Sequence, residues 1–151
     1  MRKVLFFLAA FSITSAVHSQ SLFEAAAQCI KRYEGLHTPE HYPYVGYGHR
    51  LLSGEKFVAG MGEERADSLL REDLLRKCRV FRTFGKDSLL LGVLAYNIGE
   101  TKVLKSRLAG KLRTGDRDIY SEYVSFRLID GKVSPALEKR RREEFKLLFN
   151  D

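Results

Sequence analysis

The chain has 151 residues, a formal net charge of +7, two cysteines and four histidines. This length suits one domain with a substantial hydrophobic core. The positive charge favours an anionic partner such as nucleic acid, anionic lipid or the bacterial cell wall. Because the cysteines and histidines lack the spacing of zinc ligands, we expect neither a metal site nor a cofactor.

The first nineteen residues have the pattern of an export signal. Arg2 and Lys3 precede an apolar run over residues 4–17, and a plausible cleavage position follows. The run is too short and too interrupted to span a membrane well, so we expect no stable membrane insertion after cleavage. The sequence therefore predicts a signal peptide over residues 1–19 and an exported protein, periplasmic or secreted. Export argues against nucleic acid as the partner and favours the cell wall.

Residues 20–151 predict a single, mostly helical domain. We expect short strands and a turn within residues 42–58, and helices over residues 21–33, 63–82, 88–98, 103–112, 117–128 and after Ser134-Pro135. Residues 88–98 are apolar nearly all round, which predicts a central core helix with Asp87 as its N-cap and Gly99 at its end.

Glu34 is the most informative single residue. It follows the first predicted helix at helical spacing from Phe23 and Ile30, so it points the same way as the apolar stripe. Partial burial would keep such a carboxyl group protonated near neutral pH, as a general acid requires. The run Gly46-Tyr47-Gly48-His49 follows, and glycine at alternate strand positions allows a bulky ligand to approach the backbone closely. This combination favours a general acid beside a sugar-binding cleft.

Three blocks of sequence, taken in order, resemble the phage-type lysozymes. They are Glu34-Gly35-Leu36 with Gly46-Tyr47-Gly48-His49; Leu94-Ala95-Tyr96-Asn97-Ile98-Gly99 with Ser106-Arg107-Leu108 and Thr114-Gly115-Asp116; and Gly131-Lys132 with residues 136–144, which hold an Arg-Arg-x-x-Glu signature. Together the blocks cover about residues 22–149.

The resemblance implies an α+β, mostly α, lysozyme-like fold with a small N-terminal β-hairpin lobe and a helical C-terminal lobe. It also implies a monomeric glycosidase that cleaves the β-1,4 bond between N-acetylmuramic acid and N-acetylglucosamine in peptidoglycan. Glu34 would be the catalytic acid. The residues implied to bind the substrate are Gly46, Tyr47, Gly48, Tyr96, Asn97 and Ser106.

The sequence departs from this family where a second catalytic residue is expected. Family members carry an Asp and then a Thr before the glycine strand, but residues 37–43 contain no Asp and Tyr44 stands at the position of the Thr. An inverting hydrolase needs a second group to activate water, roughly 6.5–9.5 Å from the acid. We expect Tyr44 to matter more than Glu40, whose loop is predicted to be exposed. Thr38, His37 and His41 are the other polar candidates.

Two further functions stay open at this point. Without a base for water, the 6-hydroxyl of the muramic acid can attack instead, which is lytic transglycosylation and leaves an anhydro sugar. The third possibility is an inactive module that binds peptidoglycan without cleaving it.

Three side-chain groups outside the motifs carry structural expectations. Cys29 and Cys78 lie in separate predicted helices, and they form either a disulfide or two buried thiols. His49 is expected to pair with Asp73 of the next helix rather than to act as a base. The basic run over residues 139–142 is interleaved with glutamates, which favours a solvated helix face over a patch that binds the cell wall.

Overall fold

The computed structural model describes residues 21–56 and 60–150, so the expected signal peptide lies outside the described residues. The first described helix covers residues 21–34, and those that follow are α2 (Glu63–Val80), α3 (Ser88–Ile98), α4 (Glu100–Leu104), α5 (Arg107–Arg113), α6 (Tyr120–Val124) and α7 (Pro135–Leu148). Two short 3-10 helices are η1 (Pro39–His41) and η2 (Arg82–Asp87), and two antiparallel hairpins pair β1 (Tyr44–Val45) with β2 (His49–Arg50) and β3 (Leu128–Ile129) with β4 (Lys132–Val133).

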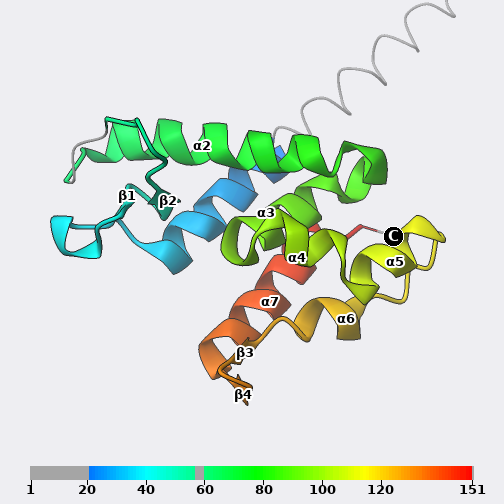
Figure 1. The fold of residues 1–151 in the computed structure, drawn as a ribbon. Coiled ribbons are helices and arrows are strands. Elements are labelled where there is room, and N and C mark those ends of the chain that lie inside the picture. Colours follow the sequence, from blue (N-terminus) through cyan, green and yellow to red (C-terminus); the bar gives the residue numbers. More distant parts are fainter. Residues whose placement is uncertain (1–20, 57–59, 151) are drawn as a thin grey trace, which may run out of the picture.

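The elements form two lobes that α2 connects. Figure 1 shows the β1–β2 hairpin and η1 beside one end of α2, and the helices from α3 onward gathered beside its other end. Helix 21–34 and α7 are joined by ion pairs, Arg32 with Glu143 and Glu34 with Arg140. The predicted mostly helical, two-lobed α+β fold is therefore confirmed.

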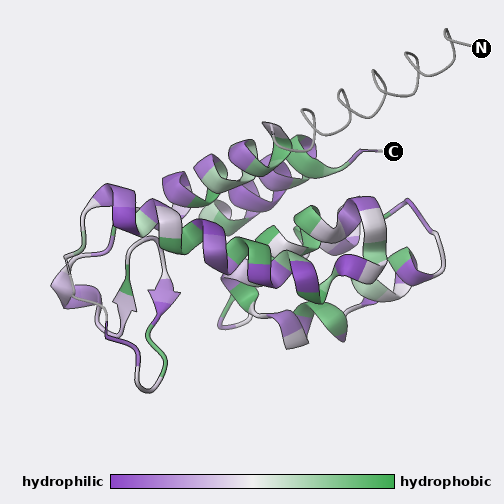
Figure 2. Ribbon diagram, turned by 90° about the horizontal axis from the view of Figure 1, so that it is seen from above, coloured by the Kyte–Doolittle hydropathy of each residue, from purple (hydrophilic) through white to green (hydrophobic). Residues whose placement is uncertain are grey.

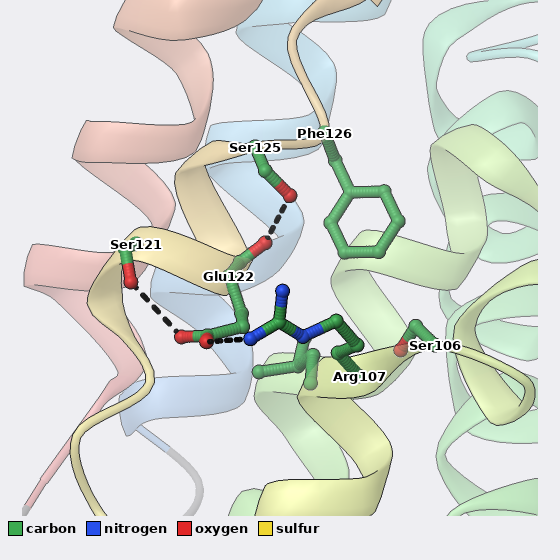
Figure 3. Close-up of a pocket in the computed structure, with 7 residues that line it drawn as sticks. Ser106, Arg107, Ser121, Glu122, Ser125 and Phe126 are labelled. Carbon is green, nitrogen blue, oxygen red and sulfur yellow. Dashed lines mark hydrogen bonds and ion pairs between the residues drawn. The ribbon is translucent and has the colours of Figure 1, made fainter.

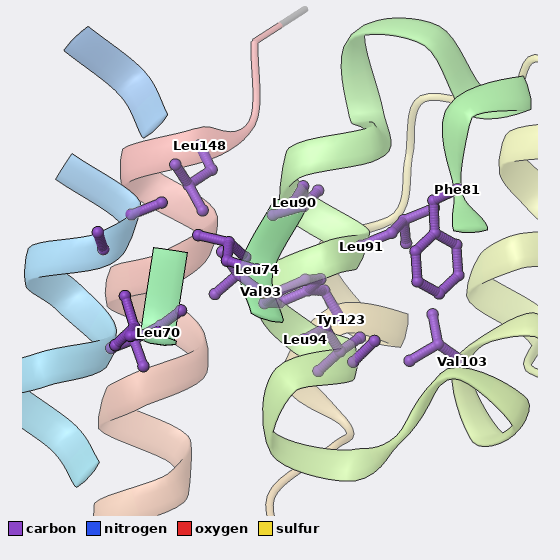
Figure 4. Close-up of a cluster of buried hydrophobic side chains, with 14 of the residues drawn as sticks. Leu70, Leu74, Phe81, Leu90, Leu91, Val93, Leu94, Val103, Tyr123 and Leu148 are labelled. Atoms are coloured by element: carbon purple, nitrogen blue, oxygen red, sulfur yellow. The ribbon is translucent and has the colours of Figure 1, made fainter. Parts of the chain in front are cut away.

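The predicted central helix is α3, and it forms the middle of the hydrophobic core. Its residues Leu90 to Ala95 are all buried, and Leu91, Val93 and Leu94 have no exposed surface. Figure 4 shows their side chains between those of α2 and those of the helices that follow. Gly99 ends the helix as predicted, with a φ of 86° that favours glycine.

Helix α2 is amphipathic over its whole length. Ala66, Leu69, Leu70 and Leu74 are buried, as the spacing predicts, and Figure 2 shows hydrophilic and hydrophobic residues alternating along the helix. The helix ends at Val80 rather than at residue 82, because the chain tightens there into the 3-10 helix η2.

Asp87 stands at the predicted N-cap position of α3, but its side chain does not act as a cap. Its backbone is already helical, and its side chain makes no capping hydrogen bond. The carboxylate instead binds Arg117, whose Nη1 lies 2.6 Å from Oδ2. The carboxylate of Asp87 is therefore used in a partly buried ion pair rather than in a capping hydrogen bond.

The two helices predicted after α3 are also wrong in their boundaries. The segment expected at 103–112 is divided into α4 and α5, because Ser106 is extended and its hydroxyl accepts a hydrogen bond from Ala109 N–H. The segment expected at 117–128 contains only α6 and then a hairpin. Asp130 and Gly131 have φ values of 50° and 76°, which fit the two central residues of a tight hairpin turn.

Both cysteines are free thiols. Cys29 is buried in helix 21–34, and Cys78 packs against α3 at Gly92, where a Cβ atom would lie 2.7 Å from the sulfur. The outcome is therefore two free thiols, Cys29 buried and Cys78 partly buried, rather than a disulfide.

No helix in residues 21–56 and 60–150 is long and apolar enough to cross a membrane. The same described residues contain no cluster of three or more His, Cys, Asp or Glu side chains suited to a metal ion.

Candidate active site

Glu34 lies at the end of helix 21–34 and is held by a residue of α7. Its Oε1 accepts a hydrogen bond from Nη1 of Arg140 at 2.8 Å, and 19% of its side chain is exposed. Apolar burial was expected around this carboxyl group, but an ion pair is what the structure provides. A fixed guanidinium holds the carboxylate in one orientation, as a catalytic group requires.

Arg140 belongs to a buried charged network on α7. Its Nε donates to Glu144 Oε1 at 2.8 Å, while Arg141 Nη1 and the hydroxyl of Tyr123 share Glu144 Oε2 at 2.7 and 3.0 Å. Arg141 and Glu144 have no exposed side-chain surface. Burial acts to lower the pKa of Arg140, but the charges of Glu144 and Glu34 outweigh it, and the pKa is raised. Arg140 therefore stays a cation that two carboxylates hold.

This network corrects the expectation of a solvated basic face at residues 139–142. Arg140 and Arg141 are 4% and 0% exposed, so they are neither a solvated face nor a surface patch. Arg142 does face solvent, where it pairs with Glu138. The signal that could have been read is Glu144, placed three and four residues after the two arginines.

Gly48 is the glycine that faces Glu34. A Cβ atom at this position would lie 3.3 Å from Glu34 Oε2, and its φ of 93° favours glycine. Gly46 faces α2 instead, since its Cβ would lie 3.4 Å from Ala66. Tyr47 is also turned away, buried at 6% exposure with Lys31 5.0 Å above its ring. Of the three implied contacts in this strand, only Gly48 borders the carboxylate.

A cleft of about 640 Å³ opens beside Gly48, between the β1–β2 hairpin and the ends of α2 and α3. It is lined by Tyr44, Gly48, His49, Arg50, Leu52, Asp73, Arg76, Lys77, Tyr96, Ile98, Gly99 and Glu100. The hydroxyl of Tyr96 donates to the carbonyl oxygen of Tyr47 at 2.8 Å, and burial raises its pKa. The cleft thus brings together three of the implied residues, Tyr44, Gly48 and Tyr96.

The loop before β1 carries two histidines stacked on each other. Their ring centroids lie 4.8 Å apart, and His37 also meets Tyr44 edge-on at 6.2 Å. Burial, and then the neighbouring His41, lower the pKa of His37. Its buried Nδ1 has no hydrogen-bond partner among the described residues. Glu40 lies on the exposed helix η1 and does not line the cleft.

His49 has the structural role that the sequence predicts. Its Nδ1 lies 2.6 Å from Asp73 Oδ2, and its Nε2 lies 3.0 Å from Glu55 Oε2. Glu55 in turn accepts a hydrogen bond from Leu52 N–H at 2.8 Å. The imidazole therefore joins the hairpin, the segment after it and α2, which fixes one wall of the cleft.

Two other implied residues lie away from the cleft. Asn97 accepts a hydrogen bond from Arg141 Nη2 at 2.7 Å through its Oδ1, so it supports the buried network. Ser106 borders a separate pocket of about 390 Å³, whose lining shares no residue with the cleft. Figure 3 shows this pocket, with the side chain of Arg107 between Ser106 and Glu122.

Comparison with known proteins decides the family. The sequence model of the phage lysozyme family matches residues 28–144. The chain belongs to the phage lysozyme family. It is therefore a muramidase, a glycosidase that cleaves peptidoglycan. No curated protein sequence matches this chain.

Solved structures of this family and of a related muramidase have the same fold. The endolysin of Escherichia coli O157:H7 phage FAHEc1 is 22% identical with a TM-score of 0.67, covering 83% of this chain and 90% of its own. The muramidase domain of SpmX from Asticaccaulis excentricus is 24% identical with a TM-score of 0.70, covering 84% and 96%. A mutant of P22 lysozyme is 22% identical with a TM-score of 0.66, covering 82% and 94%.

Proposed function

We propose that this muramidase is exported and cleaves the β-1,4 bond between N-acetylmuramic acid and N-acetylglucosamine, with Glu34 as the general acid. The observation that carries the proposal is the orientation of the Glu34 carboxylate. Oε1 is bound by Arg140, whereas Oε2 is directed at Gly48, where a side chain is missing. A sugar ring that lies against this glycine meets Oε2 directly.

The division of labour between the two oxygens suits proton delivery. When Oε1 accepts from Arg140, the proton of the neutral acid belongs on Oε2, from which it passes to the leaving glycosidic oxygen. Arg140 then stabilises the carboxylate that forms.

We assign Tyr44 the second role, that of orienting water or the substrate. Tyr44 lines the cleft and is 43% exposed, and its ring rests on the edge of His37. Gly48 and Tyr96 complete the substrate-binding set in the cleft. Three further residues support this substrate-binding set. Gly46 packs against Ala66 of α2, and the carbonyl oxygen of Tyr47 accepts a hydrogen bond from Tyr96. Asn97 accepts a hydrogen bond from Arg141.

Lytic transglycosylation is the second candidate, and the charges of the cleft favour it. Within residues 21–56 and 60–150, the carboxylates that line the cleft are Asp73 and Glu100, and both are paired with basic side chains. In this route the 6-hydroxyl of the muramic acid attacks C1, and the bond from C1 to the leaving oxygen breaks. Glu34 gives its proton to the leaving oxygen and takes the proton of the hydroxyl, so water is not consumed.

Export rests on the sequence of residues 1–19 and on the location of peptidoglycan outside the cytoplasmic membrane. Expression of the full chain with a tag at its carboxyl end tests it. We expect the mature protein to begin near Gln20 outside the cytoplasm, and an uncleaved protein retained inside the cell would contradict export.

The catalytic assignment is tested on purified peptidoglycan with four proteins. We expect Glu34→Gln to lose at least about 10²-fold in rate while keeping its fold, because Gln cannot donate the proton. Tyr44→Phe should lose more activity than Glu40→Gln, which serves as the matched control for removing a carboxylate. A Glu34→Gln protein that keeps more than a tenth of the activity, or an inactive Glu40→Gln, would overturn the assignment. The mass of the products then decides the reaction, since anhydro ends are lighter than hydrolysed ends by one water.

A further inference from the structure

Among residues 21–56 and 60–150, one basic side chain that lines the cleft has no acidic partner. Three basic side chains other than His49 line it: Arg50, Arg76 and Lys77. Arg76 binds Asp73, and Lys77 Nζ lies 2.8 Å from Glu100 Oε1. Within residues 21–56 and 60–150, the guanidinium of Arg50 has neither a hydrogen bond nor an ion pair. An unpaired guanidinium at the wall of a binding cleft is a site for an anion.

The hairpin places Arg50 beside Tyr44. The two residues are direct partners in the antiparallel register of β1 and β2, so their side chains lie on the same face. Both line the cleft and both are exposed. The face therefore offers a guanidinium and a phenol hydroxyl to the same ligand. His49, the neighbour of Arg50, is fixed by Asp73 and Glu55, which keeps the end of the hairpin in place.

The ligand that fits this face is a carboxylate. Peptidoglycan supplies carboxylates on the lactyl group of the muramic acid when the peptide is absent, and on the stem peptide when it is present. The sugars themselves carry no other anion. Because the planar guanidinium can bind both oxygens of a carboxylate, it adds orientation as well as attraction.

We propose that Arg50, with Tyr44 beside it, forms a subsite for a carboxylate carried on the muramic acid. The proposal rests on the proposed function, since it places the glycan strand in the same cleft. It makes Arg50 a determinant of substrate choice: strands that keep this carboxylate are bound in preference to strands in which it is amidated.

The test measures binding with the Glu34→Gln protein, which holds the strand without cleaving it. Three soluble fragments are compared: a peptide-bearing muropeptide tetrasaccharide, the same fragment with its carboxylates amidated, and a peptide-free tetrasaccharide with its lactyl carboxylate. Adding Arg50→Gln should weaken binding of a carboxylate-bearing fragment at least tenfold and change binding of the amidated fragment less than twofold. The fragment that loses affinity identifies the source of the carboxylate. Arg82→Gln, an exposed arginine on η2 outside the cleft, is the matched control.

The possible results separate this proposal from the proposed function. If the fragments bind and Arg50→Gln weakens all three equally or none, the carboxylate subsite is wrong and the cleft assignment stands. If none binds, the cleft assignment and the subsite both fail. A second measurement uses the active protein, should Glu34→Gln not fold: Arg50→Gln should slow lysis of untreated peptidoglycan more than lysis of amidated peptidoglycan, and an equal slowing would contradict the subsite.

Discussion

At the scale of single residues, the site depends on how close the backbone comes to Glu34. Two features favour glycine at position 48. Its φ is 93°, and a Cβ atom there would lie only 3.3 Å from Glu34 Oε2. Gly115 has a similar φ of 80° but faces open space. The two glycines therefore separate backbone strain from contact with the catalytic carboxylate.

We predict that Gly48→Ala and Gly115→Ala both lose stability, by roughly 1–2 kcal/mol, because Ala is strained in the left-handed region. Only Gly48→Ala should also lose activity, at least about tenfold, since small displacements of a catalytic group are costly. Thermal unfolding and lysis rates measure the two effects. Equal activity of the folded variants would show that Gly48 serves backbone geometry alone.

The cysteines give a second prediction at this scale. Burial raises the pKa of Cys78 to about 11 and also raises the pKa of Cys29. Since the thiolate is the reactive form, Cys78 in the native protein should react with a thiol reagent at pH 8 about a hundredfold more slowly than an exposed cysteine. In denaturant, both thiols should react without prior reduction. Failure of the denatured, unreduced protein to react would show a disulfide between them.

At the scale of elements, α7 is the helix whose Arg140 fixes the position of Glu34. Glu144 is fully buried and is the common partner of Arg140, Arg141 and Tyr123. Glu138, on the same helix, pairs with Arg142 and Arg127 nearer the surface. The helix thus carries one buried and one solvent-facing network.

We predict that Glu144→Gln lowers stability by about 3–5 kcal/mol, because it leaves buried guanidinium groups without their carboxylate. The activity of the fraction that stays folded should also fall, since Arg140 loses the anchor that positions it against Glu34. Glu138→Gln should change stability little, as exposed ion pairs contribute little. Urea unfolding measures both variants, and a Glu144→Gln protein as stable as Glu138→Gln would contradict this role.

The sequence predicts the elements whose signal is local. Apolar spacing was enough for α2 and α3, and Ser134-Pro135 does open α7, where the Ser134 hydroxyl accepts a hydrogen bond from Leu137 N–H. The β3–β4 hairpin was also readable, because Asp130-Gly131 between apolar residues is a strong turn signal. The predicted helix over residues 117–128 extends four residues past the end of α6 at Val124, and its last residue belongs to β3.

The site was predictable only in part, because its parts come from distant segments. Glu34 and Gly48 are close in sequence, and their motif was informative. Arg140 lies 106 residues from Glu34, and a run of basic residues normally indicates a solvated face. Glu144 on the same helix is a local signal that Arg140 and Arg141 are paired, but nothing local predicts that Arg140 also reaches Glu34, a carboxylate that another helix provides.

At the scale of the whole molecule, helix 21–34 is tied to α2 by Arg71. Its guanidinium binds both oxygens of Glu24, at 2.8 and 3.1 Å, and also Asp67 Oδ2 at 2.5 Å. Hydrogen bonds from Arg71, and then from Gln28, lower the pKa of Glu24 from 4.5 to about 2. Arg71 is also the main cause that lowers the pKa of Asp67. The contact joins the helix that carries Glu34 to the helix that bridges the lobes.

These lowered pKa values predict how stability depends on pH. A carboxylate whose pKa is lower in the folded protein stabilises the fold above its unfolded pKa, near 4.5 for Glu24, and this contribution is lost as pH falls toward 2. The melting temperature should therefore fall between about pH 5 and pH 2. Arg71→Met should be less stable at pH 7 and should lose less on acidification, because Glu24 and Asp67 then titrate more nearly as they do in the unfolded chain. Arg82→Met, which removes an exposed arginine of η2, is the control and should follow the wild-type curve of melting temperature against pH. An Arg71→Met curve parallel to that of the wild type would show that the contact of Arg71 with Glu24 and Asp67 does not contribute to the pH dependence of stability.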